Sequence, residues 1–202
     1  MRRPAKMKSP LIVITGGPGA GKTAVLEYIR LTLCEHVVIF PEAASILFGG
    51  GFWRLPSTPA RKAAQRAIYF VQNEMQNLVQ GEKKWNMGLC DRGTLDGLAY
   101  WPGRERDYFT SLETTKIKEY AKYKAVLHLS SPSLAQGYNY QNPVRNESPE
   151  LAAEIDEKIH KVWRDHPGYF RILNHDQFSK KLEIASSKIK SLIPPCRLDH
   201  SP

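Results

Sequence analysis

Short apolar runs alternate along the chain with longer stretches whose apolar residues recur at helical spacing. Runs of strand length occupy residues 11–15, 36–40, 85–90, 124–130 and 169–173. Helical stretches occupy residues 22–33, 59–80, 106–122, 149–162 and 177–192. Strands that alternate with helices are typical of a mostly parallel sheet covered on both faces. The pattern therefore predicts an α/β fold, a three-layer sandwich around a five-stranded sheet.

Two of these helices carry more specific signals. The helix over residues 59–80 is expected to place one apolar face against the core. That face consists of Ala64, Ile68, Val71, Met75 and Leu78. Ser148 followed by Pro149 predicts where the next-to-last helix begins. Serine caps helix N-termini, and proline suits the first helical position.

The composition is that of a globular protein. Hydrophobic residues make up 42% of the 202 residues and charged residues 24%, which are ordinary values. No apolar run approaches the ~18 residues of a membrane-spanning helix. The apolar run after the basic N-terminus is too short for a secretory signal, so we expect a cytoplasmic protein. No linker separates two cores, so we expect residues 1–202 to form a single domain with its core at about residues 9–193.

The three cysteines, Cys34, Cys90 and Cys196, are widely spaced and form no cluster with histidines. We therefore expect no zinc site, and reduced thiols with Cys34 and Cys90 buried. The net charge of +9 suits nucleic acid, anionic lipid or phosphorylated small molecules. Because no recognition helix, zinc finger or aromatic RNA motif is present, nucleic acid is disfavoured. Anionic lipid stays open as a partner, and the oligomeric state cannot be read.

The segment GGPGAGKT, residues 16–23, follows the first strand and opens a helix. It fits G-x-x-x-x-G-K-[ST], a loop whose backbone N–H groups cradle phosphates at a helix N-terminus. Lys22 is expected to reach the β- and γ-phosphates, and the Thr23 hydroxyl to ligate Mg²⁺. The predicted nucleotide-binding residues are Gly17, Pro18, Gly19, Ala20, Gly21, Lys22, Thr23 and Ala24.

Asp91 ends the third strand and Arg92 follows it. Ligands of parallel sheets bind at the carboxyl ends of strands, so Asp91 is placed to contact the magnesium of a nucleotide. Motor and chaperone ATPases generally place a glutamate after this acid. Arg92 cannot act as a base because it stays protonated, but it can clamp a phosphoryl group. The pair therefore favours transfer of phosphate to an acceptor other than water.

Glu42 directly follows the second strand and therefore lies at the same edge of the sheet. From there its carboxylate could take a proton from an acceptor hydroxyl, or order that hydroxyl for attack. The alternative is an ordinary glutamate in the first turn of a helix.

In order, these motifs resemble the P-loop AAA domain family that includes ribosylnicotinamide kinase domains and the TRP-channel translocation-defective protein. More distantly, the chain is similar to thymidylate kinases and deoxynucleoside kinases. The resemblance covers about residues 9–193 and rests on five segments. They are GGPGAGKT at 16–23, PEAA at 41–44, QRAIYFVQ at 65–72, DRGTLDGLAY at 91–100 and YNYQNPVRNES at 138–148.

The resemblance implies a kinase-like P-loop NTPase with a lid over residues 132–148, in which Arg145 matches the recurring lid arginine. Such a lid excludes water and neutralises the transferring phosphoryl group. The resemblance supports Glu42 as the residue that activates the acceptor. It also implies an acceptor pocket that contains Arg66, Gln72, Asp96 and Tyr100. A solvent-facing Gln72 and a solvated Arg145 stay open as alternatives.

The leading hypothesis is a kinase that uses Mg²⁺ and ATP on a small nucleoside- or nucleotide-like acceptor. Its catalytic residues would be Lys22, Glu42, Arg92 and Arg145, and its metal ligands Thr23 and Asp91. No Asn-Lys-x-Asp segment follows a strand, which favours ATP while leaving GTP open. The second hypothesis is a GTP- or ATP-dependent regulatory protein that binds phosphoinositide or a protein partner. A third, a nucleic-acid-acting ATPase, lacks the glutamate after Asp91. Nucleotide hydrolysis also stays open.

Overall fold

The computed structural model describes residues 9–82, 84–132, 148–175 and 177–194, and contains one five-stranded sheet. The strands are β1 (Leu11–Thr15), β2 (Val37–Phe40), β3 (Met87–Asp91), β4 (Ala125–Leu129) and β5 (Tyr169–Ile172). They lie in the order β2-β3-β1-β4-β5, and every neighbouring pair is parallel. The five predicted strands and the α/β class are confirmed.

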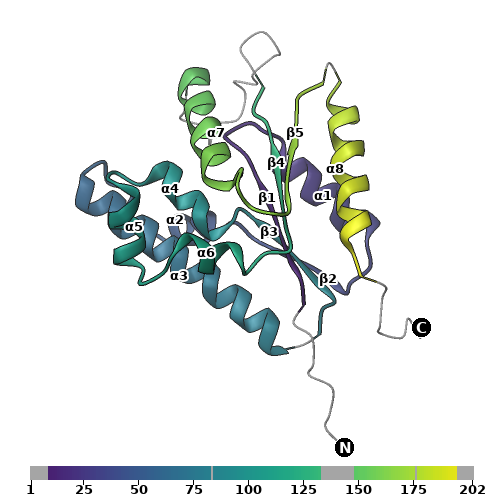
Figure 1. Cartoon of the computed structure of the whole chain (residues 1–202), viewed down its shortest axis with the longest axis horizontal. Coiled ribbons are helices and arrows are strands. Elements are labelled where there is room, and N and C mark those ends of the chain that lie inside the picture. Colours follow the sequence, from purple (N-terminus) through teal and green to yellow (C-terminus); the bar gives the residue numbers. More distant parts are fainter. Residues whose placement is uncertain (1–8, 83, 133–147, 176, 195–202) are drawn as a thin grey trace, which may run out of the picture.

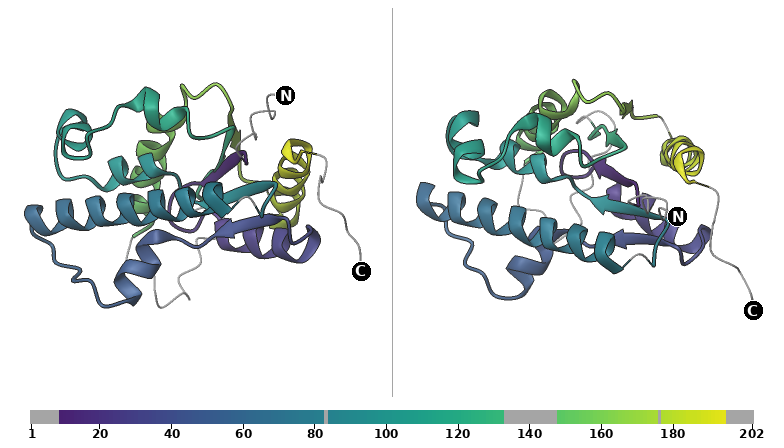
Figure 2. Two further views of the ribbon diagram at one scale, coloured as in Figure 1. Left: turned by 90° about the horizontal axis from the view of Figure 1, so that it is seen from below. Right: turned by 60° about the horizontal axis from the view of Figure 1, so that its bottom comes forward.

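Helices cover both faces of this sheet (Figure 1). On one face lie α1 (Lys22–Thr32) and α8 (Phe178–Leu192). The other face carries the longer α3 and α7 together with shorter helices. These are α2 (Ala43–Gly49), α3 (Thr58–Glu82), η1 (Thr94–Asp96), α4 (Gly97–Tyr100), α5 (Glu105–Ser111), α6 (Lys116–Tyr120) and α7 (Pro149–Trp163). Figure 2 shows α3 as the longest helix, with α2 beside it.

The alternation of side chains along β1 explains the three layers, because successive residues of a strand face opposite sides of a sheet. Ile12 and Ile14 pack in the core under α1 and α8. Leu11 and Val13 pack in the second core, which includes Trp163 of α7. All five residues are at most 3% exposed, so β1 is the central strand of the fold.

The parallel register brings the functional segments to one edge of the sheet. Ile14 of β1 pairs with Asp91 of β3, and Phe40 of β2 pairs with Cys90. The phosphate loop after β1, Glu42 after β2 and Asp91 at the end of β3 therefore emerge together. This is the edge at which the sequence places the ligand.

The buried face of α3 differs from the predicted one. Leu78 is 61% exposed, whereas Gln72 and Gln76 are each only 4% exposed. The two amides have partners in the interior: Gln72 donates to the carbonyl of Arg92, and Gln76 donates to the hydroxyl of Tyr123 at 2.9 Å. Because a buried amide is stable only when hydrogen-bonded, these contacts allow a polar stripe to face the core.

The single helix predicted over residues 106–122 is wrong, since the chain forms α5 and α6 there with a break between them. Glu113 has a φ of 52°, outside the helical region. Thr115 then caps α6 by accepting a hydrogen bond from the amide of Lys118. A left-handed residue followed by a new N-cap ends one helix and begins the next.

Other predictions divide into corrected and untested ones. Cys90 is buried as predicted, but Cys34 is exposed just after α1. Arg145, Cys196 and nearly all of the predicted lid lie outside the described residues. Among the helices in the described ranges, none combines the length and apolar character needed to cross a lipid bilayer. The single domain and the cytoplasmic location stay predictions.

Candidate functional site

The phosphate loop is a tight turn held against the end of β4. Gly16 has a φ of 140°, and a Cβ there would come within 2.1 Å of the carbonyl oxygen of Leu129. Gly21 has a φ of 92°, and a Cβ there would meet the ring of Phe178 at 2.5 Å. Only glycine combines these backbone angles with such close approach. Both motif glycines are thus required by the fold itself.

Lys22 is the first residue of α1 and curls back over the loop. Its ammonium group donates to the carbonyls of Gly16 at 2.9 Å and Gly17 at 3.1 Å. Burial, followed by the nearby charge of Arg92, lowers the pKa of Lys22 to about 7. A lysine destabilised in its charged form gains from an arriving anion. The side chain is therefore prepared for a phosphate.

A cavity of about 610 Å³ opens beside the loop. Loop residues Pro18, Gly19, Lys22 and Thr23 line it. Opposite them, the cavity is lined by residues from β3, from the chain between β2 and α3 (which includes α2), from α3 and from the segment after β3. This second set includes Glu42, Phe48, Arg54, Gln65, Ile68, Tyr69, Gln72, Asp91, Arg92, Asp96, Tyr100 and Tyr108. A cavity of this size accommodates a nucleotide-sized ligand.

Asp91 provides a test of whether magnesium fits. Its Oδ1 atom is buried and has no hydrogen-bond partner among the residues that the structure describes, although nearly all buried polar atoms have one. Burial raises the pKa of Asp91 to about 6. Within the described residues, no cluster of three or more His, Cys, Asp and Glu side chains could hold a metal by itself. Mg²⁺ on a nucleotide needs only one or two protein ligands, so Asp91 and Thr23 fit this ion.

Glu42 and Arg92 form an ion pair across the ends of β2 and β3. The Nε of Arg92 donates to Oε1 of Glu42 at 2.6 Å. Ser45 donates to the other carboxylate oxygen at 2.6 Å. Burial alone would raise the pKa of Glu42, but Arg92 and Ser45 outweigh burial and hold the pKa below its usual range. Glu42 is thus ionised at neutral pH.

The backbone at Arg92 is unusual. Its φ is 73°, a left-handed conformation that is costly for a residue with a Cβ. Two contacts fix it: the Arg92 amide donates to the carbonyl of Ile14 at 3.0 Å, and the Arg92 carbonyl accepts from Gln72. The guanidinium reaches the carbonyl of Gly16 at 3.4 Å. The strained residue therefore links β1, β3, α3 and the phosphate loop.

Asp96 lines the cavity but is already saturated with partners. One carboxylate oxygen accepts from Thr15, and the other accepts from the indole of Trp163 at 2.7 Å. Arg92 lies 3.6 Å from the first oxygen. Both oxygens are engaged and the side chain is only 4% exposed, against 29% for Glu42, so Asp96 is placed to orient Arg92. Its role in an acceptor pocket stays a prediction.

Of the remaining predicted acceptor residues, Gln72 and Tyr100 line the cavity and Arg66 does not. Gln72 is buried and lines the cavity, but its amide donates to the backbone of Arg92. Tyr100 lines the cavity, and its ring lies 5.7 Å from the Arg92 guanidinium. Arg66 is half-buried and does not line the cavity, whereas its neighbour Gln65 does. The functional roles of all three stay predictions.

Sequence reasoning missed the α2–α3 side of the cavity. Phe48 and Arg54 line it, and the Arg54 guanidinium lies 5.0 Å from the Phe48 ring. Both belong to α2 and the glycine- and proline-rich segment after it, to which the sequence assigned no role. The useful signal was position, because aromatic and basic residues that follow a strand by a few residues lie at the ligand edge.

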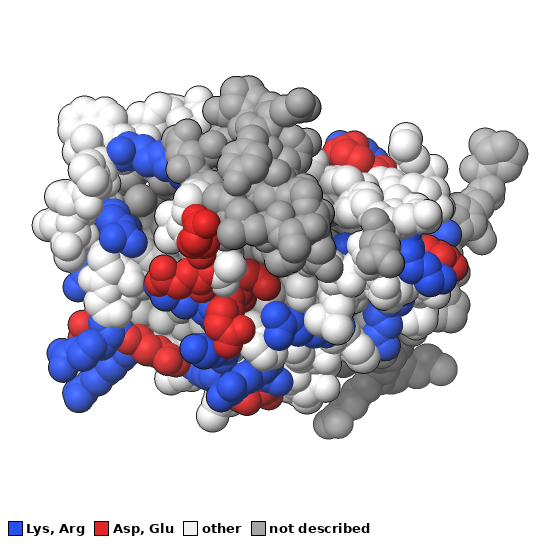
Figure 3. Space-filling model, turned by 90° about the horizontal axis from the view of Figure 1, so that it is seen from above, with Lys and Arg blue, Asp and Glu red and all other residues white. Residues whose placement is uncertain are grey.

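The surface at this edge is mixed in charge. Figure 3 shows acidic side chains gathered near the centre of the face seen from above in Figure 1, with lysines and arginines around them. The net charge of +9 is therefore not concentrated into one basic surface on this face. An anionic lipid partner stays a prediction.

Comparison with known proteins agrees with this architecture. The sequence matches the AAA domain family over residues 11–181. Among curated proteins, none matches it. Solved structures that are similar include a deoxyadenosine kinase from M. mycoides with bound dATP. It is 15% identical with a TM-score of 0.58, and the match covers 90% of this chain and 99% of that one.

Two thymidylate kinases are similar to the same extent. The enzyme from Ehrlichia chaffeensis is 12% identical with a TM-score of 0.56, covering 92% of this chain and 98% of its own. The enzyme from Candida albicans is 15% identical with a TM-score of 0.59, covering 92% and 94%. Identities this low show a shared fold and nothing finer.

Proposed function

We propose, from the premise that this chain belongs to the AAA domain family, that it transfers the γ-phosphoryl group of Mg·ATP to a small nucleoside- or nucleotide-like acceptor. The single observation that carries the proposal is the Glu42–Arg92 pair, which lines the same cavity as the phosphate loop. The three solved structures named above are a deoxyadenosine kinase and two thymidylate kinases, which supports this class of acceptor.

On the donor side, the phosphate loop binds the nucleotide and Lys22 neutralises its terminal phosphates. Thr23 and Asp91 would hold Mg²⁺, which when bound neutralises charge on the phosphate oxygens. Asp91 Oδ1, buried without a partner, is the atom that supports this assignment. ATP is proposed as the donor, and GTP stays open because the loop contacts phosphates and not the base.

On the acceptor side, Glu42 orients the attacking hydroxyl. Its pKa lies below the usual range because Arg92 and Ser45 outweigh the effect of burial, so the carboxylate is a weak base and a good hydrogen-bond acceptor. The hydroxyl oxygen bonds to the γ-phosphorus as the bond to the bridging oxygen of ADP breaks, and the hydroxyl proton passes to the Glu42 carboxylate during the attack or to the transferred phosphoryl group after it. Catalysis on this account is mainly positioning and electrostatics, as is usual in phosphoryl transfer.

Arg92 stabilises the transferring phosphoryl group. Its guanidinium is held by Glu42 and by the neighbouring Asp96, so it is fixed in place before the ligand arrives. A preorganised cation costs little reorganisation when charge develops. Arg145 is proposed as a second such cation, which rests on the resemblance of the lid segment alone.

The test is incubation of the pure protein with Mg·ATP and a panel of nucleosides, nucleotides and ribosylnicotinamide. Mass spectrometry should detect one acceptor made heavier by a single phosphate. Lys22→Met, which removes the loop cation, is the matched negative control. A panel that yields no phosphorylated acceptor, while ADP and inorganic phosphate accumulate, would replace the kinase with a hydrolase.

A further inference from the structure

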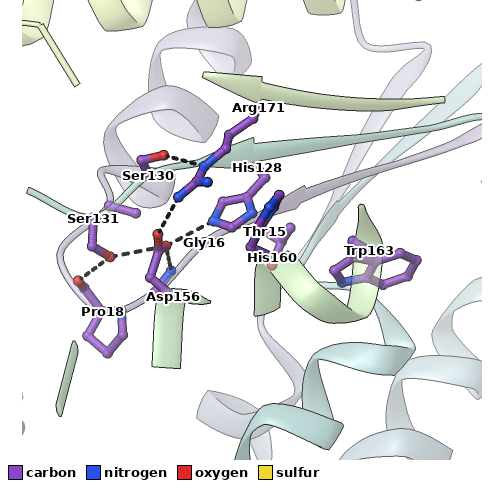
Figure 4. Close-up of polar contacts among 12 residues, drawn as sticks. Thr15, Gly16, Pro18, His128, Ser130, Ser131, Asp156, His160, Trp163 and Arg171 are labelled. Atoms are coloured by element: carbon purple, nitrogen blue, oxygen red, sulfur yellow. Dashed lines mark hydrogen bonds and ion pairs between the residues drawn. The ribbon is translucent and has the colours of Figure 1, made fainter. Parts of the chain in front are cut away.

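The side of the phosphate loop that faces away from the cavity carries a second polar cluster, built from β4, β5 and α7 (Figure 4). Its centre is Asp156, which is only 6% exposed. The Oδ1 atom of Asp156 accepts a hydrogen bond from the backbone amide of Gly17 at 2.7 Å. Gly17 is in the loop but does not line the cavity, so Asp156 holds the loop without occupying the ligand space.

The approach of Asp156 to the loop is as close as the backbone allows. A Cβ at Gly17 would lie 2.6 Å from Oγ of Ser131 and 2.9 Å from Cβ of Asp156. Ser131 in turn donates to the carbonyl of Pro18 at 3.0 Å. Two consecutive loop residues are thus held from one side by fixed polar groups.

The Asp156 carboxylate is itself held in place. His128 lies 2.9 Å from Oδ1 through Nε2, and Arg171 lies 3.8 Å from Oδ2. Burial alone would raise the pKa of Asp156, but His128 and the Gly17 amide outweigh it and lower the pKa. An ionised carboxylate makes a shorter and stronger bond to an amide than a neutral oxygen does.

A chain of hydrogen bonds continues behind His128. Its Nδ1 is 2.8 Å from the Tyr169 hydroxyl, which is 2.7 Å from Nδ1 of His160. His128 with its proton on Nε2 donates to Asp156 and accepts from Tyr169, and Tyr169 accepts from His160. This assignment satisfies every member of the chain, so the carboxylate has one fixed orientation.

We infer that Asp156 is a positioning residue for the donor nucleotide: it fixes the Gly17 amide, and thereby the curl of the phosphate loop, through a carboxylate that His128 and Tyr169 orient. The inference rests on the proposed binding of a nucleoside triphosphate at the loop. It adds a residue on α7, far along the chain from the loop, to the donor half of the site. Asp156 itself does not line the cavity.

Asp156→Asn is the variant that tests the inference, because it keeps the shape of the side chain and removes its charge. Glu154→Gln is the matched control, since it removes one carboxylate from the exposed face of the same helix, where Glu154 pairs with Lys158. Thermal unfolding of both variants establishes that they fold. If Asp156→Asn does not fold, the Tyr169→Phe variant is used in its place, because it removes only one hydroxyl from the hydrogen-bond chain behind His128.

The first readout is the Gly17 amide in the protein without nucleotide. The chain has 14 glycines, but only residues 17, 50 and 51 follow another glycine. Labelling glycine with ¹⁵N and carbonyl ¹³C therefore selects three amides by their one-bond coupling. In the wild type the Gly17 proton should be strongly downfield, as expected for an amide bonded to a carboxylate. It should move upfield in Asp156→Asn, or in Tyr169→Phe to a smaller extent, and stay in place in Glu154→Gln.

The second readout is the affinity for Mg·ATP. Loss of the charge-assisted bond should raise the dissociation constant about tenfold in Asp156→Asn. Turnover at saturating ATP should stay near the wild-type rate, which separates positioning from catalysis. An unmoved Gly17 amide, or a shifted amide with wild-type affinity, overturns the inference. If the wild type binds no nucleotide the proposed function fails, and the amide alone then shows whether Asp156 holds the loop.

Discussion

Two lysines contact the phosphate loop, and they differ in how their hydrogen bonds are used. Lys181 of α8 donates to the carbonyls of Ala20 at 2.8 Å and Ser130 at 2.6 Å, and to the side chain of Asn174 at 2.8 Å. These three acceptors match the three N–H bonds of an ammonium group. Lys22 has two loop carbonyls and faces the cavity. The first lysine is saturated by the protein, and the second keeps capacity for a ligand.

The same difference separates the two sides of the loop. On the cavity side, defined by Lys22, Glu42, Asp91 and Arg92, Lys22 donates to only two carbonyls, and Asp91 has a buried oxygen without a hydrogen-bond partner among the described residues. On the buttress side, defined by Ser131, Asp156 and Lys181, the polar atoms bond to the loop and to each other. Unused capacity for hydrogen bonds is found on the cavity side, whereas the polar groups of the buttress side are saturated with hydrogen bonds.

The largest expected effect is on the cavity side. Lys22→Met removes the cation that should neutralise the terminal phosphates, so phosphoryl transfer should fall about a thousandfold. The unfolding temperature should change by only a few degrees, because two effects oppose each other: two loop carbonyls lose their donor, while a lysine whose charged form the fold disfavours is removed. Acceptor phosphorylation and calorimetry measure the two effects. A strong fall in stability would place Lys22 with the supporting groups.

Glu42→Gln tests the acceptor half of the cavity side. The amide keeps the size of the side chain but loses the charge that orients a hydroxyl, so turnover should fall about a hundredfold. The affinity for Mg·ATP should change by less than about twofold, because Glu42 is not part of the phosphate loop. Steady-state kinetics and a nucleotide titration distinguish these outcomes. Wild-type turnover in this variant would remove Glu42 from the mechanism.

These two residues also show how far the sequence alone could go. The phosphate loop, Glu42, Asp91 and Arg92 were predicted together because the carboxyl ends of parallel strands meet at one edge. Asp156 could not be found this way, since a lone carboxylate on an amphipathic helix resembles a solvated residue. Its partner Gly17 is 139 positions away. The burial of Gln72 was missed for the same reason: its acceptor is a backbone carbonyl, which leaves no pattern in the sequence.

On the buttress side, Lys181→Met should act on stability. The substitution leaves two buried carbonyls and the partly buried side chain of Asn174 without their donor, which should cost about 2 kcal/mol of the free energy of unfolding. At a temperature where the variant is folded, the rate of the transfer step should stay within a fewfold of the wild type. Denaturant unfolding and single-turnover kinetics provide the two numbers. A large loss of transfer without loss of stability would contradict the assignment of Lys181 to support.

The smallest expected effect is an uptake of less than one proton per nucleotide when Mg·ATP binds. At pH 8, Lys22 is mostly neutral in the free protein because its pKa is about 7. A bound triphosphate favours the charged form, so binding should take up protons at this pH. Asp91, with a pKa of about 6, is already ionised at pH 8 and contributes little. Calorimetric titration of Mg·ATP in Tris and in HEPES measures the uptake, which should disappear in Lys22→Met.

The central claim is that the phosphoryl group is transferred to an acceptor. The most direct test compares the amounts of all phosphate-containing products. ADP, inorganic phosphate and phosphorylated acceptor are measured in the same reaction, with and without the acceptor identified by the panel. We predict that ADP is released slowly without the acceptor and faster with it. With the acceptor present, the amount of ADP released should equal the amount of phosphorylated acceptor formed. Release of ADP that equals inorganic phosphate at an unchanged rate, with or without acceptor, would contradict the account.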